Sequence, residues 1–289
     1  MTVTLLGHRF DGGMGTLLQD RGLEGGAAGE LWNVENPDAV RAIHQEYVDA
    51  GATILTTNTF GGTRPRLDMH GLGDRVHELN AAAARVARSV ADQAGILVAG
   101  DLGPTGELMD PLGTQTEAAA RALFAEQLDG LVEGGIDLVL IETMSDLSEV
   151  RAAVAAAHEV APSLPVVATM SFDTNLRTMM GVTPAAAVTE IGALGVAAVG
   201  ANCGRGPEEM EQIMTAMAAV RPPGLLLAAQ SNAGLPQVVG DHFEYDASPA
   251  ELARHAARLR ALGVDLVGVC CGSTPTHVSA IRDVLGATA

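Results

Sequence analysis

Short apolar runs alternate with helical patterns along the whole chain of 289 residues. Eight such pairs follow one another, and the runs are apolar throughout, as in parallel strands covered on both faces. The simplest closure of eight successive β–α units is a barrel. The sequence therefore predicts an α/β fold, a (β/α)8 TIM barrel that forms a single domain over residues 1–289.

The strands are predicted from short runs rich in Val, Leu, Ile and Ala. In chain order, the predicted strands are Val3–Phe10, Thr53–Thr57, Ile96–Asp101, Leu138–Glu142, Val166–Met170, Ala198–Asn202, Leu225–Gln230 and Leu266–Val269.

The helices are predicted between these runs. Several begin with Pro in the first turn, where its missing N–H is tolerated, and several end at a Gly that leads into the next strand. The predicted helices are Pro37–Ala50, Asp74–Ala94, Glu117–Gly134, Leu147–Val160, Pro184–Leu194, Pro207–Val220, Pro249–Leu262 and Pro275–Leu285.

A doubly wound open sheet is the structural alternative. That fold normally carries a G-x-G-x-x-G phosphate loop after its first strand. The segment DGGMG at 11–15 is rich in glycine but does not match this pattern, so the barrel is the preferred prediction.

Composition excludes several classes of protein. The formal net charge is −18, which argues against nucleic-acid binding because phosphate contacts need clustered Lys and Arg. No apolar run approaches the roughly 18 residues of a membrane span, and the start of the chain lacks the pattern of a signal peptide. Three cysteines, an odd number, suit a reducing compartment rather than a disulfide framework. We therefore expect a cytoplasmic protein without a nucleic-acid or membrane partner.

In a barrel, the active site forms at the carboxyl ends of the strands. All three cysteines follow strands there: Cys203 the sixth, and Cys270 and Cys271 the eighth. Asp101 ends the third strand, but its place in the sharp loop sequence GDLGPTG predicts a structural role.

The cysteines have two readings. Free cysteines are often small buried hydrophobes, but three that converge favour a metal site, with zinc as the ion because zinc suits thiolates and is redox-inert. Neighbours on a strand point to opposite faces, so Cys270 and Cys271 can share one ion only if the strand ends at Cys270 and Gly272 bends the chain. Three thiolates with one open position can bind an incoming thiol and keep it nucleophilic. The predicted chemistry is alkylation of a thiol.

Two acids also end strands, Asp11 the first and Glu142 the fourth. They either cap loop amides or bind an ammonium group. In the second reading the backbone amides of Gly12 and Gly13 hold a carboxylate nearby, and the substrate is an amino acid.

Two further residues have alternative roles. Trp32, the single tryptophan, lies in a loop rich in Gly and Glu. It serves either as a hydrophobic lid or as a cation–π contact for a quaternary ammonium group. Asn232, after the seventh strand, either orients a loop or contacts the ligand.

Six short motifs resemble the homocysteine S-methyltransferase family, and together they span nearly the whole chain. They are DGGMGT at 11–16, TNTFGG at 57–62, GPTG at 103–106, IETM at 141–144, GANCG at 200–204 and GVCCGSTP at 268–275. The resemblance implies a zinc (β/α)8 barrel that methylates homocysteine to methionine. By position, Cys203, Cys270 and Cys271 match the family's zinc ligands. Asp11, Gly12 and Glu142 match the residues that hold the amino-acid end of homocysteine.

Members of this family differ in methyl donor: glycine betaine, S-methylmethionine, or a methyl-corrinoid delivered by other modules. Trp32 lies where betaine users carry a Trp near the donor, so we expect glycine betaine or a related small onium compound. Thr143 matches the corrinoid-dependent type instead, and Gly61 replaces a large aromatic residue of the betaine enzymes. A corrinoid-dependent subunit, similar to the homocysteine barrel of cobalamin-dependent methionine synthase and partnered by a corrinoid protein, is the alternative. A non-catalytic zinc- and thiol-binding barrel is a further one, and homo-oligomerisation stays open.

Overall fold

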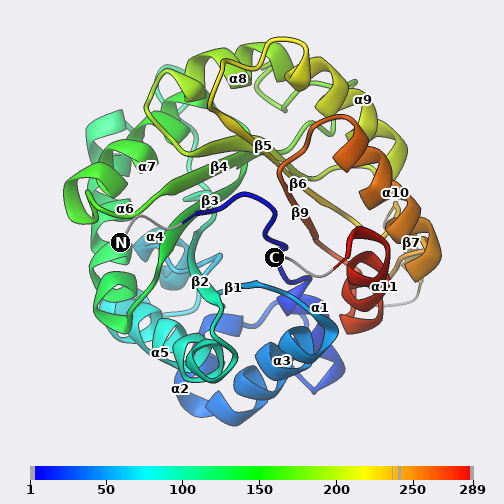
Figure 1. Ribbon diagram of the computed structural model, residues 1–289. Coiled ribbons are helices and arrows are strands. Elements are labelled where there is room, and N and C mark those ends of the chain that lie inside the picture. The colour runs from blue at the N-terminus through cyan, green and yellow to red at the C-terminus, as the bar shows by residue number, and fades with distance from the viewer. Residues whose placement is uncertain (1–3, 236, 240–241, 287–289) are drawn as a thin grey trace.

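The computed structural model describes residues 4–235, 237–239 and 242–286. Seven parallel strands curl into one sheet in the order β1-β2-β3-β4-β5-β6-β9, and helices surround it (Figure 1). The strands are β1 (Ile54–Thr56), β2 (Leu97–Leu102), β3 (Leu138–Met144), β4 (Val166–Met170), β5 (Ala198–Cys203), β6 (Leu226–Ser231) and β9 (Leu266–Val269). A separate antiparallel pair joins β7 (Gln237–Val239) to β8 (His242–Glu244).

The barrel closes through the segment before the first helix. Arg9 bridges Val267 of β9, and Phe10 bridges Ile54 of β1, both in parallel orientation. The backbone N–H of Phe10 donates to Val267 O at 3.0 Å. The (β/α)8 prediction is thus confirmed.

The length of the first strand was wrongly predicted. Of the expected strand Val3–Phe10, Val3 lies outside the described residues, and the bridges involve only Arg9 and Phe10. The sequence before them, from Thr4 to His8, contains Gly7, which adopts a left-handed backbone with φ of 83°. A strand cannot continue through such a residue.

The main helices lie between the strands as predicted, with several bounds matching to the residue. They are α3 (Pro37–Ala50), α5 (Val76–Ala94), α6 (Glu117–Gly134), α7 (Leu147–Val160), α8 (Pro184–Gly192), α9 (Pro207–Ala218), α10 (Pro249–Ala261) and α11 (Pro275–Leu285). Shorter pieces are α1 (Met14–Asp20), η1 (Gly29–Leu31), α2 (Trp32–Glu35), α4 (Arg64–Asp68) and η2 (Gly73–Arg75).

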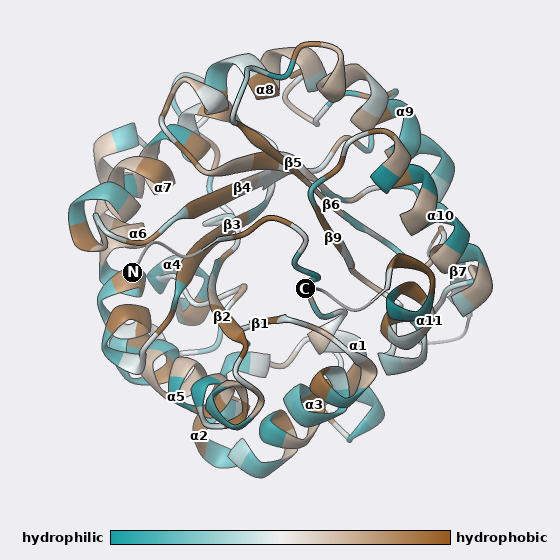
Figure 2. Cartoon of the chain, viewed as in Figure 1, coloured by the Kyte–Doolittle hydropathy of each residue, from teal (hydrophilic) through white to brown (hydrophobic). Residues whose placement is uncertain are grey.

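Apolar side chains form two layers. The larger fills the space between the strands and the helices, and the smaller fills the barrel interior with residues such as Phe10, Ile54 and Leu140. Figure 2 shows the strands as mostly brown and the outer surfaces of the helices as largely teal. Both faces of the sheet are therefore covered, which is why its strands read as continuous apolar runs.

The barrel interior changes from apolar to polar toward the carboxyl ends of the strands. Successive side chains on a strand alternate between its faces, so the residue two places after an interior apolar residue also points inward. Ala99 is followed in this way by Asp101, Leu140 by Glu142, and Ala228 by Gln230. This alternation places a ring of polar side chains above the apolar interior, and the site lies there.

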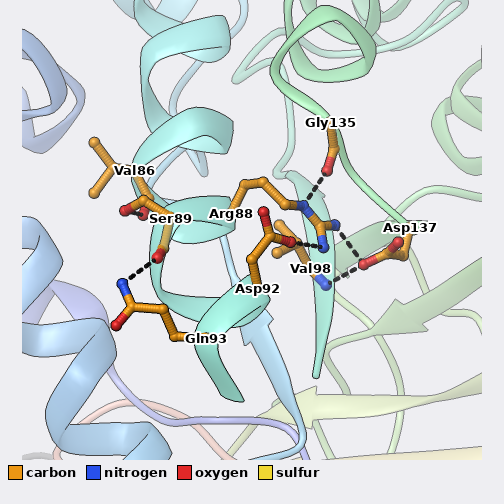
Figure 3. A network of polar contacts seen from close by, with 8 residues as sticks. All are labelled: Val86, Arg88, Ser89, Asp92, Gln93, Val98, Gly135 and Asp137. Carbon is orange, nitrogen blue, oxygen red and sulfur yellow. Dashed lines mark hydrogen bonds and ion pairs between the residues drawn. The ribbon is translucent and has the colours of Figure 1, made fainter. Parts of the chain in front are cut away.

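The opposite end of the barrel carries a repeated polar network. Arg88 of α5 donates to Gly135 O at 2.8 Å and pairs with Asp137, whose Oδ2 also accepts the backbone N–H of Val98 at 2.8 Å (Figure 3).

The same arrangement recurs before β9. Arg221 donates to Gly263 O at 2.9 Å and to Asp265 at 2.8 Å, and Asp265 accepts the N–H of Leu227 at 2.9 Å. In both copies, a Gly-x-Asp sequence follows a helix and leads into a strand. The Asp side chain accepts a backbone N–H of the neighbouring strand.

Replacing Asp137 should destabilise the fold without touching the site. We expect Asp137→Ala to lower the free energy of unfolding by about 1–3 kcal/mol, because the Val98 amide and Arg88 lose a charged acceptor. Asp92→Ala is the matched control. Asp92 pairs with the same arginine at 3.3 Å, but its side chain is 65% exposed, so its loss should change stability by less than about 0.5 kcal/mol. Urea unfolding measures both, and equal effects would contradict the proposed role of the network.

Candidate active site

A cavity of about 660 Å³ opens at the carboxyl ends of the strands. Its walls bring together residues far apart in sequence, among them Asp11, Glu142 and the three cysteines. The predicted convergence of the acids and the thiols at one end of the barrel is therefore what the structure shows.

The three sulfur atoms form a compact cluster. All lie within 4.8 Å of one another. Cys203 Sγ and Cys270 Sγ are 3.0 Å apart, and Cys270 Sγ and Cys271 Sγ are 3.8 Å apart. A disulfide bond requires about 2.05 Å, and all three cysteines are free.

A sharp turn lets adjacent cysteines share one site. Strand β9 ends at Val269, and the N–H of Cys270 still donates to Ser231 O at 2.8 Å. Gly272 then turns with φ of 74°. A side chain at this position would also meet the ring of Tyr245, with a Cβ only 2.1 Å from Cγ of that ring. Glycine is needed here for both reasons.

Cys203 itself adopts a left-handed backbone, with φ of 57°, and so does Thr143 with φ of 60°. Such conformations are costly for residues other than glycine and need support from their surroundings. Asn202 supports the turn at Thr143. Its Oδ1 accepts the N–H of Thr143 at 2.7 Å, and its Nδ2 donates to the Thr143 hydroxyl at 2.6 Å. The residue before Thr143, Glu142, is thereby held at the cavity wall.

Asn232 joins the two cysteine loops. Its Oδ1 accepts the N–H of Cys271 at 3.1 Å, and its Nδ2 donates to Gly204 O at 2.9 Å. It is not among the cavity-lining residues. The structure therefore favours the loop-orienting reading of Asn232 over ligand contact.

The segment after Asp11 packs closely against the loop of the paired cysteines. A Cβ at Gly12 would lie 2.6 Å from Ser273 Oγ, so only glycine fits. The N–H of Gly13 donates to Ser273 Oγ at 3.0 Å, and this hydroxyl donates to Cys270 O at 2.6 Å. The Gly13 amide is thus already occupied, contrary to the expectation that it is available to a substrate carboxylate.

Burial controls the protonation of the acids. It raises the pKa of Asp11 to about 7, although the hydrogen bond from the N–H of Thr56 at 2.8 Å offsets part of the effect. Burial, and then the nearby charges of Cys271 and Asp11, raise the pKa of Glu142 to about 8. Both groups would ionise more readily beside a bound cation.

The thiols of Cys270 and Cys271 differ in pKa. Hydrogen bonds from Cys203 and Cys270 lower the pKa of Cys271 to about 3. The hydrogen bond to Cys203, followed by the one to Cys271 and by burial, raises the pKa of Cys270 well above its usual range. One thiolate therefore forms easily, and further ionisation needs a positive charge nearby.

Two expectations about single residues change. Trp32 is absent from the cavity lining and packs instead against the large apolar layer from α2. Its predicted contact with a donor cation finds no support, whereas its role as a packing residue does.

Asp101, expected to be structural, lines the cavity, as do Gln230 and Thr56. The two-residue alternation along β1, β2 and β6 is the sequence signal that would have identified them.

The comparisons with known proteins agree with this geometry. The family model of homocysteine S-methyltransferase matches residues 10–285. The chain belongs to this family. Its membership confirms the expected class of enzyme, an S-methyltransferase.

Similar proteins include methionine synthases from mycobacteria. The one from Mycobacterium tuberculosis is 36% identical and covers 96% of this chain, and the one from Mycobacterium leprae is 34% identical over the same share. The chain spans about a quarter of the length of these relatives, 24% in each case.

A solved structure shows the same fold over almost the full length. The metallated homocysteine methyltransferase MmuM from Escherichia coli superimposes with a TM-score of 0.79 at 24% identity, covering 96% of this chain and 95% of that one. Within the described ranges, no helix has the length and apolar character needed to cross a bilayer.

Replacing Asn232 should loosen the cysteine cluster. If the cysteines hold zinc, as the sequence predicts, Asn232→Ala should weaken zinc binding by about 10–100-fold, as loss of partners that orient ligands does. Titration against a zinc chelator measures this, with Gln93→Ala on the exposed part of α5 as the control. If Asn232 instead contacts the substrate, zinc affinity will stay unchanged and the KM for homocysteine will rise.

Asp101 should make stability depend on pH. Burial, then the charges of Glu142, Asp11 and Glu30, raise its pKa well above the usual range. The folded state therefore holds this proton more tightly than the unfolded chain, whose Asp pKa is about 3.9. The contribution to stability is complete below a pH of about 4 and is lost as the pH rises toward the folded pKa.

We therefore expect Asp101→Asn to gain stability over the wild type as the pH rises above about 4, by about 1.4 kcal/mol per pH unit until the folded pKa is passed. Urea unfolding of the metal-free proteins at several pH values measures the difference. A difference that does not vary with pH would show that Asp101 ionises normally in the folded chain.

Proposed function

We propose that residues 1–289 form a zinc-dependent barrel that transfers a methyl group to homocysteine and releases methionine. The observation that carries this proposal is the cluster of three sulfur atoms within 4.8 Å, in the wall of a cavity that Asp11 and Glu142 also line. A metal that binds a thiol and two acids that bind an ammonium group match the two ends of homocysteine.

The cysteines fit zinc. A tetrahedral ion with Zn–S bonds of about 2.3 Å needs sulfurs about 3.8 Å apart, close to the 3.8 Å between Cys270 and Cys271. The 3.0 Å between Cys203 and Cys270 would widen modestly. Cys203, Cys270 and Cys271 would hold the ion, and when bound it would keep the substrate thiol deprotonated near neutral pH.

The acids would hold the other end of the substrate. Asp11 directly follows the bridging residues Arg9 and Phe10, and Glu142 belongs to β3. Both residues line the cavity. An ammonium group between them would offset the effect of burial, which raises both pKa values, and would favour the ionised forms. Gly12 also lines the cavity, so the same end of the substrate would lie beside it.

For the methyl donor we propose glycine betaine or another small onium compound. The substrate thiolate attacks a methyl carbon of the donor, a C–S bond forms, the C–N bond breaks, and its electron pair stays on nitrogen. A negative and a positive charge cancel in this step. A cavity with little water therefore favours the transition state, which needs less solvation than the separated charges. Trp32 does not line the cavity, so it gives this donor no support. The support comes instead from the acidic side chains in the cavity wall, which would attract a cationic donor.

A methyl-corrinoid partner is the second candidate. The mycobacterial relatives are named methionine synthases, and this chain matches only 24% of their length. If the donor is carried by another module, the same barrel would meet a corrinoid protein at the open mouth of the cavity. In either case the three free thiols suit a reducing cytoplasm.

Turnover by the purified chain tests the proposal. With zinc, homocysteine and glycine betaine, we expect methionine by mass spectrometry, and a loss of more than about 100-fold after zinc removal or in Cys203→Ser, because the substrate thiol is then mostly protonated. Arg205→Ala is the control, since its side chain is 51% exposed and lies outside the cavity lining.

Three other outcomes decide between the alternatives. Methionine formed only with an added methyl-corrinoid protein would reverse the order of donors. Homocysteine binding without transfer from any donor would support a non-catalytic thiol-binding barrel. Full activity of the zinc-free chain would refute the proposed metal chemistry.

A further inference from the structure

The cavity holds more acidic side chains than homocysteine and zinc account for. Four carboxylates line it, and among its described lining residues Arg66 is the only arginine or lysine. In the proposed function, Asp11 and Glu142 hold the substrate ammonium group. Glu30 and Asp101 have no ligand assigned to them.

Asp101 has an unsatisfied side chain on a fixed backbone. Its N–H donates to the Thr57 hydroxyl at 3.0 Å, and its carbonyl accepts the Thr59 hydroxyl at 2.8 Å. The residue is only 3% exposed. Its Oδ1 is buried and has no hydrogen-bond partner within the described part of the chain. Buried carboxylates normally have partners because an unpaired one is costly, so this group points to a ligand.

Glu30 and Phe60 complete a wall of the cavity with Asp101. The N–H of Gly61 donates to Glu30 Oε1 at 2.7 Å, which fixes Glu30 beside Phe60. The Phe60 ring packs against Gly103, where a Cβ would lie 2.7 Å from Cδ2 of the ring. Gly103 follows Asp101 by two residues, so Phe60 connects the Glu30 side of this wall to the Asp101 side, and both acids line the same cavity.

We propose that Asp101, Glu30 and Phe60 form a second cation subsite, which holds the onium group of a small methyl donor. The class of ligand is a quaternary ammonium or sulfonium cation that also presents a methyl group. Acids supply Coulomb attraction, and the aromatic face attracts the same charge. The inference rests on the proposed function, since homocysteine must occupy Asp11 and Glu142 for Asp101 and Glu30 to be free.

The subsite has a consequence for product release. Methyl transfer removes the positive charge of the donor, because the electron pair of the broken bond stays on its nitrogen or sulfur. A thioether product then loses its attraction to Asp101 and Glu30 while the product methionine remains near the cysteines, whereas an amine product loses it only until it takes up a proton. The subsite thus favours the donor over its own product.

Two isosteric probes test the subsite by binding alone. Glycine betaine and 3,3-dimethylbutanoate have the same shape and the same carboxylate, but the second carries carbon in place of the cationic nitrogen. With zinc-loaded chain and saturating homoserine, which keeps the amino-acid end of homocysteine but has no thiol to be methylated, we expect calorimetry to give a Kd at least about tenfold lower for betaine, the equivalent of about 1.4 kcal/mol.

Asp101→Asn and Glu30→Gln should each reduce this ratio to less than about threefold while leaving the Kd of homocysteine within about twofold of the wild type. Retained homocysteine binding shows that a variant is folded. The matched control is Glu142→Gln, which should weaken homocysteine binding and keep the preference for betaine when homoserine is saturating.

Three results would overturn the subsite: equal affinity for the two probes, no binding of either, or unchanged discrimination in Asp101→Asn. Loss of homocysteine binding in Asp101→Asn would assign Asp101 to the amino-acid end instead. The proposed function can fail separately, because discrimination between the probes without methyl transfer would leave the subsite in place and refute the reaction.

Discussion

The site depends on backbone turns that hold three sulfur atoms together. Neighbouring residues on a strand point apart, so Cys270 and Cys271 converge only because β9 ends at Val269 and Gly272 takes a left-handed turn. Cys203 approaches them from a left-handed turn of its own. Asn232 then links the two loops by hydrogen bonds at both ends of its side chain. The ligand geometry is therefore organised by the protein, and an ion need not order the loops when it binds.

Negative charge is the second constraint, and it makes the ligands of the cavity cooperative. Burial raises the pKa values of Asp11 and Glu142 to about 7 and about 8, so these acids are partly protonated when no cation is near. Each cation that binds favours the ionised form of the remaining groups. By linkage, an ammonium group that binds between Asp11 and Glu142 would release protons from them.

Much of this architecture could be predicted from the sequence because it follows from local rules. Proline at the first turn and glycine after the last turn placed α3 and α11 to the residue, and continuous apolar runs indicated the parallel barrel. The first strand was predicted too long because two bridging residues suffice to close a barrel between β9 and β1. The cysteines and the acids at strand ends could be found because a barrel gathers those ends on one face.

The surroundings of three residues at the site were not established from the sequence, for different reasons. Trp32 was given a donor contact from its position in a motif, but its surroundings depend on how α2 packs against the apolar layer, which local sequence does not determine. Asp101 was expected to have a structural role at the end of its strand, although counting two places from Ala99 puts it on the inner face of β2. Asn232 contacts two loops that are distant in sequence, and only the folded chain shows that both ends of its amide are occupied.

Two aspartates at opposite ends of the sheet show how function and stability are separated. Asp137 accepts an arginine and a strand N–H at the amino-terminal end, so its charge is compensated by the chain. Asp101 lies at the carboxyl end with one buried oxygen lacking a partner among the described residues. Arg66, which lines the same cavity, makes no ion pair with it among those residues. At Asp137, where only stability is at stake, the chain supplies the compensating charge. At Asp101 it supplies none, so this group keeps its proton until a cation binds, which in the proposed subsite arrives with the substrates.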